Sequence, residues 1–245
     1  MSDSRNSTPR ADQPDAEAAE RLNQRRAFLK FGGVGLAALA FGSLGASNVI
    51  AAPGNASKAQ TQTINLGTGD TAVANFAYLL EQLEADFYTR VVANNFYSGA
   101  NAEEIQILTD LRDHEIIHRE FFKNVLGSSG IPTIPAFNFS LVNFNSRESV
   151  LTVSQILEDT GVSAYNGAGQ ILTSTDILVI AGKIVSVEAR HAAAIRDLRI
   201  PRNGYASAHG EDFALDPVTV LNLAAPFLPA GLTIDASGLP RTIVV

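Results

Sequence analysis

Residues 115–118 read Glu-Ile-Ile-His, and residues 188–191 read Glu-Ala-Arg-His. In each stretch the Glu and the His are three positions apart, so in a helix they lie on the same face. Both stretches fall inside a stripe of apolar residues with helical spacing, which predicts that this face is buried. A buried carboxylate and a buried imidazole are costly without a partner. Two such pairs in one chain therefore predict a pair of bound cations.

Four helices are expected, each marked by apolar side chains at spacings of three and four residues. The first begins with Asp70 or Thr71 as its cap and ends near Asn94. A short polar link at 98–101 leads to the second helix, which carries the first Glu-x-x-His pair. The glycines of 127–130 end that helix.

A long crossover separates the second expected helix from the third. Residues 131–147 contain prolines and phenylalanines that suit neither a helix interior nor a flexible linker, so we expect a short strand or an extended crossing segment. The third helix is expected after Ser149. The fourth opens at Ser174 or Thr175 and ends before Pro201. A crossover of this length is typical of a bundle whose second and third helices are not tight antiparallel neighbours.

The two halves of the helical region resemble one another. Tyr88 follows a Leu-Glu dipeptide that ends at Glu81, and Tyr165 follows a second such dipeptide that ends at Glu158, by the same interval. In each half a helix with Glu-x-x-His comes next, which indicates an internal duplication. The repeat favours Glu81 as the partner of Glu158, whereas Glu84 lies nearer the middle of its own apolar stripe.

One Glu on each of two helices, with Glu-x-x-His on each of the other two, resembles the ligand set of ferritin-like proteins that hold two iron or two manganese ions. The likeness covers about residues 70–200. It implies an all-α fold, a ferritin-like four-helix bundle with a long crossover between its second and third helices and an irregular C-terminal tail. Zinc could also occupy such ligands. The implied metal ligands are Glu81, Glu115, His118, Glu158, Glu188 and His191.

The resemblance also implies roles for single residues. Glu115 and Glu188 would be bridging or terminal carboxylates, while each histidine would ligate one ion. Glu84 would be a base or an extra ligand, as in some peroxide-reducing relatives. A shared two-ion centre requires that His118 and His191 lie within about 10 Å of one another.

Four further side chains have weaker expectations. Tyr88 and Tyr165 could donate hydrogen bonds to ligand carboxylates or take part in redox chemistry, or they could pack with their hydroxyls at the rim of the bundle. His114 is one position off the ligand face and His209 lies in the tail, so both are expected to be exposed and without a functional role.

The segment from Glu81 to Tyr88, together with Val187 to His191, is most similar to an exported bacterial ferritin-like branch that includes plant desiccation-related proteins. That likeness implies ferroxidase, peroxidase or catalase-like activity toward dioxygen or peroxide during oxidative or desiccation stress. The alternative is a structural protein of the cell envelope, whose metal ions staple the bundle without turnover. A cage of many subunits is disfavoured by the acidic chain and the long tail, whereas a homodimer stays open.

The N-terminal region reads as a targeting signal. Arg25 and Arg26 precede Phe-Leu-Lys and an apolar run rich in Gly and Ala at 31–50, which resembles a bacterial twin-arginine export signal. The export machinery is therefore an expected partner, and the expected location is periplasmic or extracellular. Small residues at 51–56 offer cleavage points. An uncleaved signal would instead anchor the protein, because about 20 residues can just span a bilayer.

Composition narrows the remaining choices. We expect the signal and linker at 1–56, the bundle at 66–200 and a tail packed on it at 201–245. The 245 residues include no cysteine, so disulfides and thiolate metal sites are excluded. From residue 53 onward, 12 Lys and Arg stand against 20 Asp and Glu, a net charge of −8. That charge argues against nucleic acid as a partner.

Overall fold

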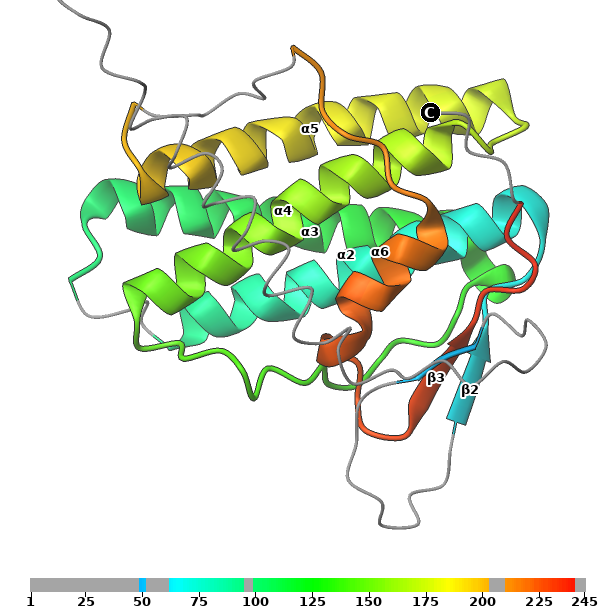
Figure 1. The fold of residues 1–245 in the computed structure, drawn as a ribbon, viewed down its shortest axis with the longest axis horizontal. Helices are drawn as coiled ribbons and strands as arrows, with labels where there is room; N and C mark the ends of the chain where they lie inside the picture. Colours follow the sequence, from blue (N-terminus) through cyan, green and yellow to red (C-terminus); the bar gives the residue numbers. More distant parts are fainter. Residues whose placement is uncertain (1–48, 52–61, 95–98, 203–209, 241–245) are drawn as a thin grey trace, which may run out of the picture. The chain divides into compact units, whose positions relative to one another are not determined.

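Four long helices run alongside one another and contain most of the core (Figure 1). They are α2 (Gly69–Ala93), α3 (Ala102–Leu126), α4 (Arg147–Gly169) and α5 (Thr175–Arg199). The computed structural model describes residues 49–51, 62–94, 99–202 and 210–240. Within these ranges the expected all-α bundle with a long crossover is confirmed. Arg25, Arg26 and His209 lie outside the described residues. Among the residues that the structure describes, no helix is long and apolar enough to cross a membrane.

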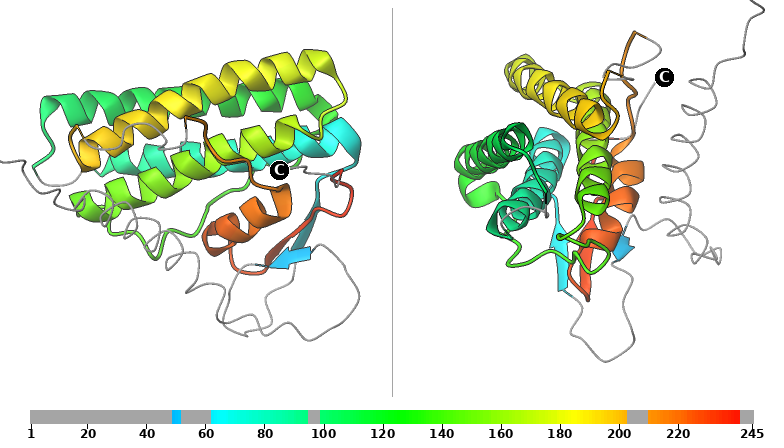
Figure 2. Two further views of the ribbon diagram at one scale, coloured as in Figure 1. Left: turned by 45° about the horizontal axis from the view of Figure 1, so that its top comes forward. Right: turned by 90° about the vertical axis from the view of Figure 1, so that its left-hand side faces the viewer.

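The helices pack as two pairs, α2 with α3 and α4 with α5 (Figure 2). Side-chain caps define three of the four starting points. The Asn101 side chain accepts from the backbone N–H of Glu104 at the start of α3, and Ser174 caps α5 as expected. The α4 helix begins earlier than expected, because Ser146 is its cap and Ser149 already lies in its first turn.

The start of α2 differs from the sequence-based prediction. The helix begins at Gly69, and neither Asp70 nor Thr71 is its cap. The Asp70 carboxylate instead accepts hydrogen bonds from the backbone N–H groups of Thr173 and Ser174, at 2.9 and 2.8 Å. These bonds lower the pKa of Asp70, and they tie the first turn of α2 to the loop between α4 and α5.

The crossover from α3 to α4 is an extended segment without a strand, and polar side chains of α2 hold it in place (Figure 1). A short 3-10 helix, η1 (Gly127–Ser129), precedes it. The side-chain oxygens of Asn75, Gln82 and Asp86 accept hydrogen bonds from backbone N–H groups of the crossover at 2.8, 2.7 and 3.0 Å. The donors are, in the same order, Ile131, Ile134 and Phe137. These three bonds to one helix satisfy part of the backbone of a segment that forms no strand pairing of its own.

The α2 helix is buried on all sides rather than along one stripe. Every residue from Asn75 to Ala85 is buried, a stretch of about three turns. The helix is covered by α3, by α4 and by the crossover, so apolar residues occur all around it. The apolar stripe expected for this helix (Val73, Ala77, Leu80, Glu84, Phe87 and Val91) is buried, but it forms only part of the buried surface.

The chain after α5 is more regular than the expected irregular tail. It forms α6 (Pro217–Ala224), η2 (Ala225–Phe227) and the strand β3 (Leu232–Asp235). Asp216 caps α6 and Pro217 occupies its first turn, a favourable combination. Leu215 donates its backbone N–H to the Ser163 carbonyl of α4 at 2.9 Å. The rings of Phe227 and Phe139 lie 5.8 Å apart, so the tail also covers the crossover.

A small sheet joins the two ends of the described chain. Its strand order is β1-β3-β2, with β1 at Val49–Ala51 and β2 at Gln62–Asn65. The central strand β3 pairs antiparallel with β1 and parallel with β2. The expected signal segment 1–56 therefore contains a strand that pairs with the C-terminal part of the chain.

Two glycines in α4 and α5 predict opposite effects of the same substitution. A Cβ at Gly167 would lie 1.8 Å from the Leu215 carbonyl oxygen, whereas one at Gly182 would meet nothing within 4 Å. We expect Gly167→Ala to lower the free energy of unfolding by about 1–3 kcal/mol or more, because backbone must move. Gly182→Ala should raise it by about 0.5–1 kcal/mol through helix propensity. Urea denaturation of both variants measures this, and equal shifts would contradict the packing of the tail on α4.

Candidate metal centre

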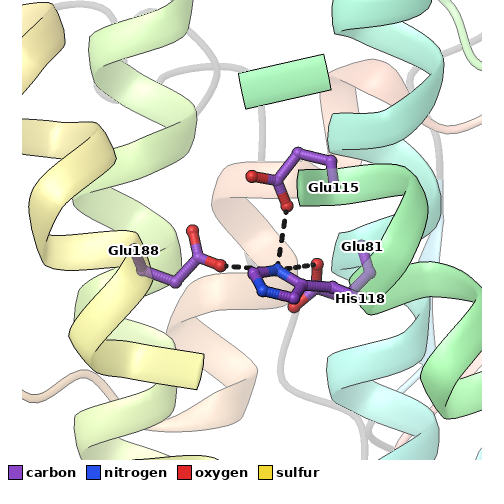
Figure 3. A group of neighbouring side chains, drawn as sticks. All are labelled: Glu81, Glu115, His118 and Glu188. Carbon is purple, nitrogen blue, oxygen red and sulfur yellow. Dashed lines mark ion pairs between the residues drawn. The ribbon is translucent and has the colours of Figure 1, made fainter. Parts of the chain in front are cut away.

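Six acidic and histidine side chains from all four helices converge inside the bundle. They form two groups in which one ligand atom per residue lies within 4.8 Å of the others. The first group, shown in Figure 3, is Glu81, Glu115, His118 and Glu188. The second group is Glu115, Glu158, Glu188 and His191. The sequence-predicted ligands thus come together, and Glu115 and Glu188 belong to both groups.

Helix geometry explains why these side chains meet. On α3 and on α5 the Glu and His of each pair are three residues apart, so both point toward the bundle axis. Glu115, Glu158 and Glu188 are 0% exposed, and His118 is the most exposed of the six at 8%. Figure 3 shows Glu188 approaching from α5 on the opposite side from Glu81 on α2. Each group is therefore closed off from bulk water by the helices that supply it.

The two shared carboxylates each offer one oxygen to either histidine. Glu115 places Oε2 3.4 Å from Nδ1 of His118 and Oε1 2.9 Å from Nδ1 of His191. Glu188 places Oε1 3.0 Å from Nδ1 of His118 and Oε2 3.5 Å from Nδ1 of His191. The two imidazole ring centres are 6.4 Å apart, well inside the expected limit of about 10 Å. This geometry suits two positions joined by two carboxylate bridges.

Each end of the centre is completed by one further carboxylate. Glu81 Oε2 lies 3.3 Å from Nδ1 of His118, and Glu158 Oε2 lies 3.4 Å from Nδ1 of His191. Tyrosine hydroxyls bind the other oxygens crosswise. Tyr88 of α2 donates to Glu158 Oε1 of α4 at 2.5 Å, and Tyr165 of α4 donates to Glu81 Oε1 of α2. Both hydroxyls are thus buried at the ligands rather than at the rim of the bundle.

Glu84 is buried beside the centre but belongs to neither group of ligand atoms. It faces Gly161, where a Cβ would lie 3.3 Å from Glu84 Oε1 and 3.7 Å from Glu188 Oε2. Gly161 is three residues after Glu158, just as Glu84 is three residues after Glu81. The second half of the repeat thus leaves space where the first half supplies a carboxyl group.

Burial and crowding make the metal-free cluster hold protons. Burial, followed by the nearby carboxylates, raises the pKa of Glu84 and of Glu115 well above the usual value. Burial lowers the pKa of His118, but the three carboxylates around it outweigh this and raise it to about 12. The pKa of His191 is raised for the same reason. Both imidazoles are therefore protonated at neutral pH when no cation is bound.

The donors and acceptors of the cluster do not satisfy one another. Among the described residues, both carboxylate oxygens of Glu115 and of Glu188 are buried without a hydrogen-bond partner. The same holds for Nδ1 of both histidines, and one N–H cannot serve three carboxylates at once. Buried polar atoms are normally paired. A cation at each position would satisfy these atoms, so the residues are compatible with bound metal ions.

His114 contacts one of the cluster histidines, which the sequence did not predict. Its side chain is exposed as expected, yet its Nδ1 lies 2.8 Å from Nε2 of His191. Burial and the neighbouring histidines lower the pKa of His114, which favours its neutral form. The two residues are 77 positions apart on different helices, and only the packing of α3 against α5 brings them together.

Metal loading is expected to release protons from this cluster. Ligation requires a neutral imidazole, so binding at both positions displaces at least two protons held by His118 and His191. Because these pKa values are raised, apparent metal affinity should rise with pH across the neutral range. Titration calorimetry with Mn²⁺ in buffers of different ionisation enthalpy counts the protons. A count near zero would show that the imidazoles are not the ligands.

The fold and the site define the class of this protein: an all-α bundle with a buried carboxylate–histidine cluster suited to metal ions. A family model described as a ferritin-like domain matches residues 69–200, more than half of the chain. The chain belongs to the ferritin-like family. A search of curated proteins finds no match.

Proposed function

We propose that this protein binds two iron or two manganese ions and uses them in redox chemistry with dioxygen or peroxide outside the cytoplasm. The main support for this proposal is that Glu115 and Glu188 each present one oxygen to His118 and the other to His191. Oxygen and imidazole ligands without thiolate suit these metals.

Charge supports a pair of divalent ions. The two groups contain four different carboxylates, Glu81, Glu115, Glu158 and Glu188. Their combined charge of −4, when all are ionised, is balanced by two divalent cations. A buried cluster is stable only when its charges are balanced. Glu84 is additional to this balance, and burial raises its pKa, which favours the uncharged acid.

Three features of the chain suit a reaction rather than storage alone. When bound, two such ions can supply two electrons, which with two protons reduce hydrogen peroxide to two waters. Glu84 lies beside Glu188 at the space left by Gly161, and burial raises its pKa, so it is suited to supplying a proton there. Tyr88 and Tyr165 hold Glu158 and Glu81 in place, and the apolar core keeps bulk water away.

A structural role is the second candidate, and one observation favours it. The ligands come from α2, α3, α4 and α5, so two ions would cross-link the whole bundle. Binding energy would then appear as folding energy, without any turnover.

One experiment separates the two roles. The full chain is loaded with Fe²⁺ or Mn²⁺ without oxygen, its metal content is measured, and peroxide consumption is then followed. The redox proposal expects two ions per chain and a turnover that Glu115→Ala and His191→Ala abolish. Glu120→Ala, on an exposed part of α3, is the matched control. Two bound ions and a higher melting temperature without turnover would favour the structural role. A chain that binds no ion would contradict both.

Export through the twin-arginine pathway, in oxidative or desiccation stress, completes the proposal. Arg25 and Arg26 followed by the apolar run support it. In a bacterial host with this pathway, the protein should fractionate outside the cytoplasm, and replacing both arginines with lysine should retain it inside. An unchanged distribution would argue against this route.

A further inference from the structure

The two histidine ligands differ in what holds their outer nitrogen. Nδ1 of His191 faces the carboxylates, and its Nε2 lies 2.8 Å from Nδ1 of His114. The ring centres are 5.1 Å apart and the ring planes differ by 13°. The centre distance exceeds the nitrogen distance by 2.3 Å, about the sum of two centre-to-nitrogen distances. The rings therefore meet edge to edge, as a hydrogen bond requires.

His118 has no corresponding partner among the described residues. Its Nδ1 faces Glu81, Glu115 and Glu188, but its Nε2 makes no hydrogen bond to the described protein. The internal repeat is broken at this point. The residue before Glu115 is His114, whereas the residue before Glu188 is Val187, which has no polar side chain.

A partner for the outer nitrogen changes how well a histidine binds metal. To ligate through Nδ1, the ring must carry its proton on Nε2 and keep a fixed orientation. Nδ1 of His114 lies where it can accept that proton, so the ring of His191 is already oriented before any ion arrives, and the proton that an ion displaces is the one on Nδ1. His118 has to be oriented at the moment of binding. Removing such an outer partner typically weakens metal affinity about 10–100-fold.

We propose that His114 makes the two metal positions unequal, so that the ion beside His191 binds first and leaves last while the ion beside His118 exchanges readily. This inference rests on the proposed two-ion centre. His114 is a positioning residue that acts through His191. Its consequence is that a chain short of metal holds a single ion, on the side of Glu158 and His191.

The test follows Co²⁺ binding to the metal-free full chain and its release to excess chelator, observed by visible absorption. We expect two phases of release whose rates differ about 10-fold or more. Glu81→Gln should remove the fast phase and keep the slow one, because Glu81 belongs only to the His118 group. Glu158→Gln should remove the slow phase and keep the fast one, because Glu158 belongs only to the His191 group.

Two substitutions at position 114 isolate the hydrogen bond. His114→Val copies the residue of the other half and should speed the slow phase about 10-fold or more, toward the fast one. His114→Asn places an amide oxygen where Nδ1 lies and should keep the two phases apart. Thermal unfolding of the metal-free variants should change little, because His114 is an exposed side chain and its bond to His191 is only part-buried.

The outcomes separate the inference from the proposed function. A chain that takes up no Co²⁺ would contradict the two-ion centre itself. Two bound ions released at one rate, or two phases unchanged in His114→Val, would overturn only the role of His114. Loss of the slow phase in Glu81→Gln would also overturn the role of His114. That result does not depend on whether the variants at position 114 fold.

Discussion

Glu188→Gln should bind neither metal ion, whereas Glu81→Gln should still bind one. Glu188 presents one oxygen to each histidine side, but Glu81 reaches only His118. The amide keeps the shape of the side chain and removes its charge, so it is a far weaker ligand for a hard cation. The metal content of the reconstituted proteins gives the answer directly.

The same difference should appear in thermal stability. An ion present at about 100 times its Kd adds about 2.7 kcal/mol to the free energy of unfolding, so two ions add about 5 kcal/mol. For a chain of this size that corresponds to a melting temperature about 10–20 °C higher. We expect the full shift in the unmodified protein, about half in Glu81→Gln, and none in Glu188→Gln.

Comparing loaded and metal-free forms of the same variant removes any effect of the substitution on the metal-free fold. Glu120→Gln serves as the control, since this residue pairs with Arg119 and Lys123 at the surface of α3. If Glu188→Gln kept the full shift, the ions would have to bind elsewhere, and the shared-carboxylate centre would be refuted.

The residues of the buried cluster could be predicted because each depends on local spacing. A Glu and a His three residues apart share a helix face whatever the rest of the fold does. The repeat of the Leu-Glu dipeptide and its tyrosine then indicated Glu81, and distance separates it from Glu84: only Glu81 joins the ligand atoms around His118. Both residues are equally buried on α2, because that helix is covered on every side, so burial would not have distinguished them.

The contacts that could not be predicted join residues distant in sequence. The bond between His114 and His191 depends on how α3 and α5 pack, which spacing along one helix does not report. The β1–β3 pairing joins segments from opposite ends of the chain, and such short strands carry little local signal. The start of α6 is different, because Asp216 followed by Pro217 is a recognisable helix start that could have been found in the sequence.

The polar side chains of α2 that hold the crossover were also not predicted, and they yield the largest expected effect on the fold. Asn75 is 1% exposed and makes three hydrogen bonds to backbone groups. It donates to the carbonyls of Leu66 and Ser129, at 3.0 and 2.9 Å, and accepts from the N–H of Ile131 at 2.8 Å. One side chain thus connects the end of β2, η1 and the start of the crossover.

Asn75→Ala should lower the free energy of unfolding by about 3–5 kcal/mol. Each buried backbone group left without a partner costs about 1–3 kcal/mol, and the gain in helix propensity is far smaller. Asn94→Ala is a matched control, because Asn94 makes one exposed bond to the Arg90 carbonyl and its loss should cost about 0.5 kcal/mol or less. Urea denaturation of the metal-free proteins measures both.

Asn75→Asp decides whether the hydrogen bonds or the packing cause this loss. The aspartate has nearly the same shape and can still accept from Ile131, but it cannot donate to the two carbonyls and would place a negative charge against them. We expect a loss at least as large as that of Asn75→Ala. A near-normal stability of Asn75→Asp would mean that shape alone matters here and that the crossover is held by its apolar residues. The α2 helix would then position Glu81 without depending on the segment that covers it.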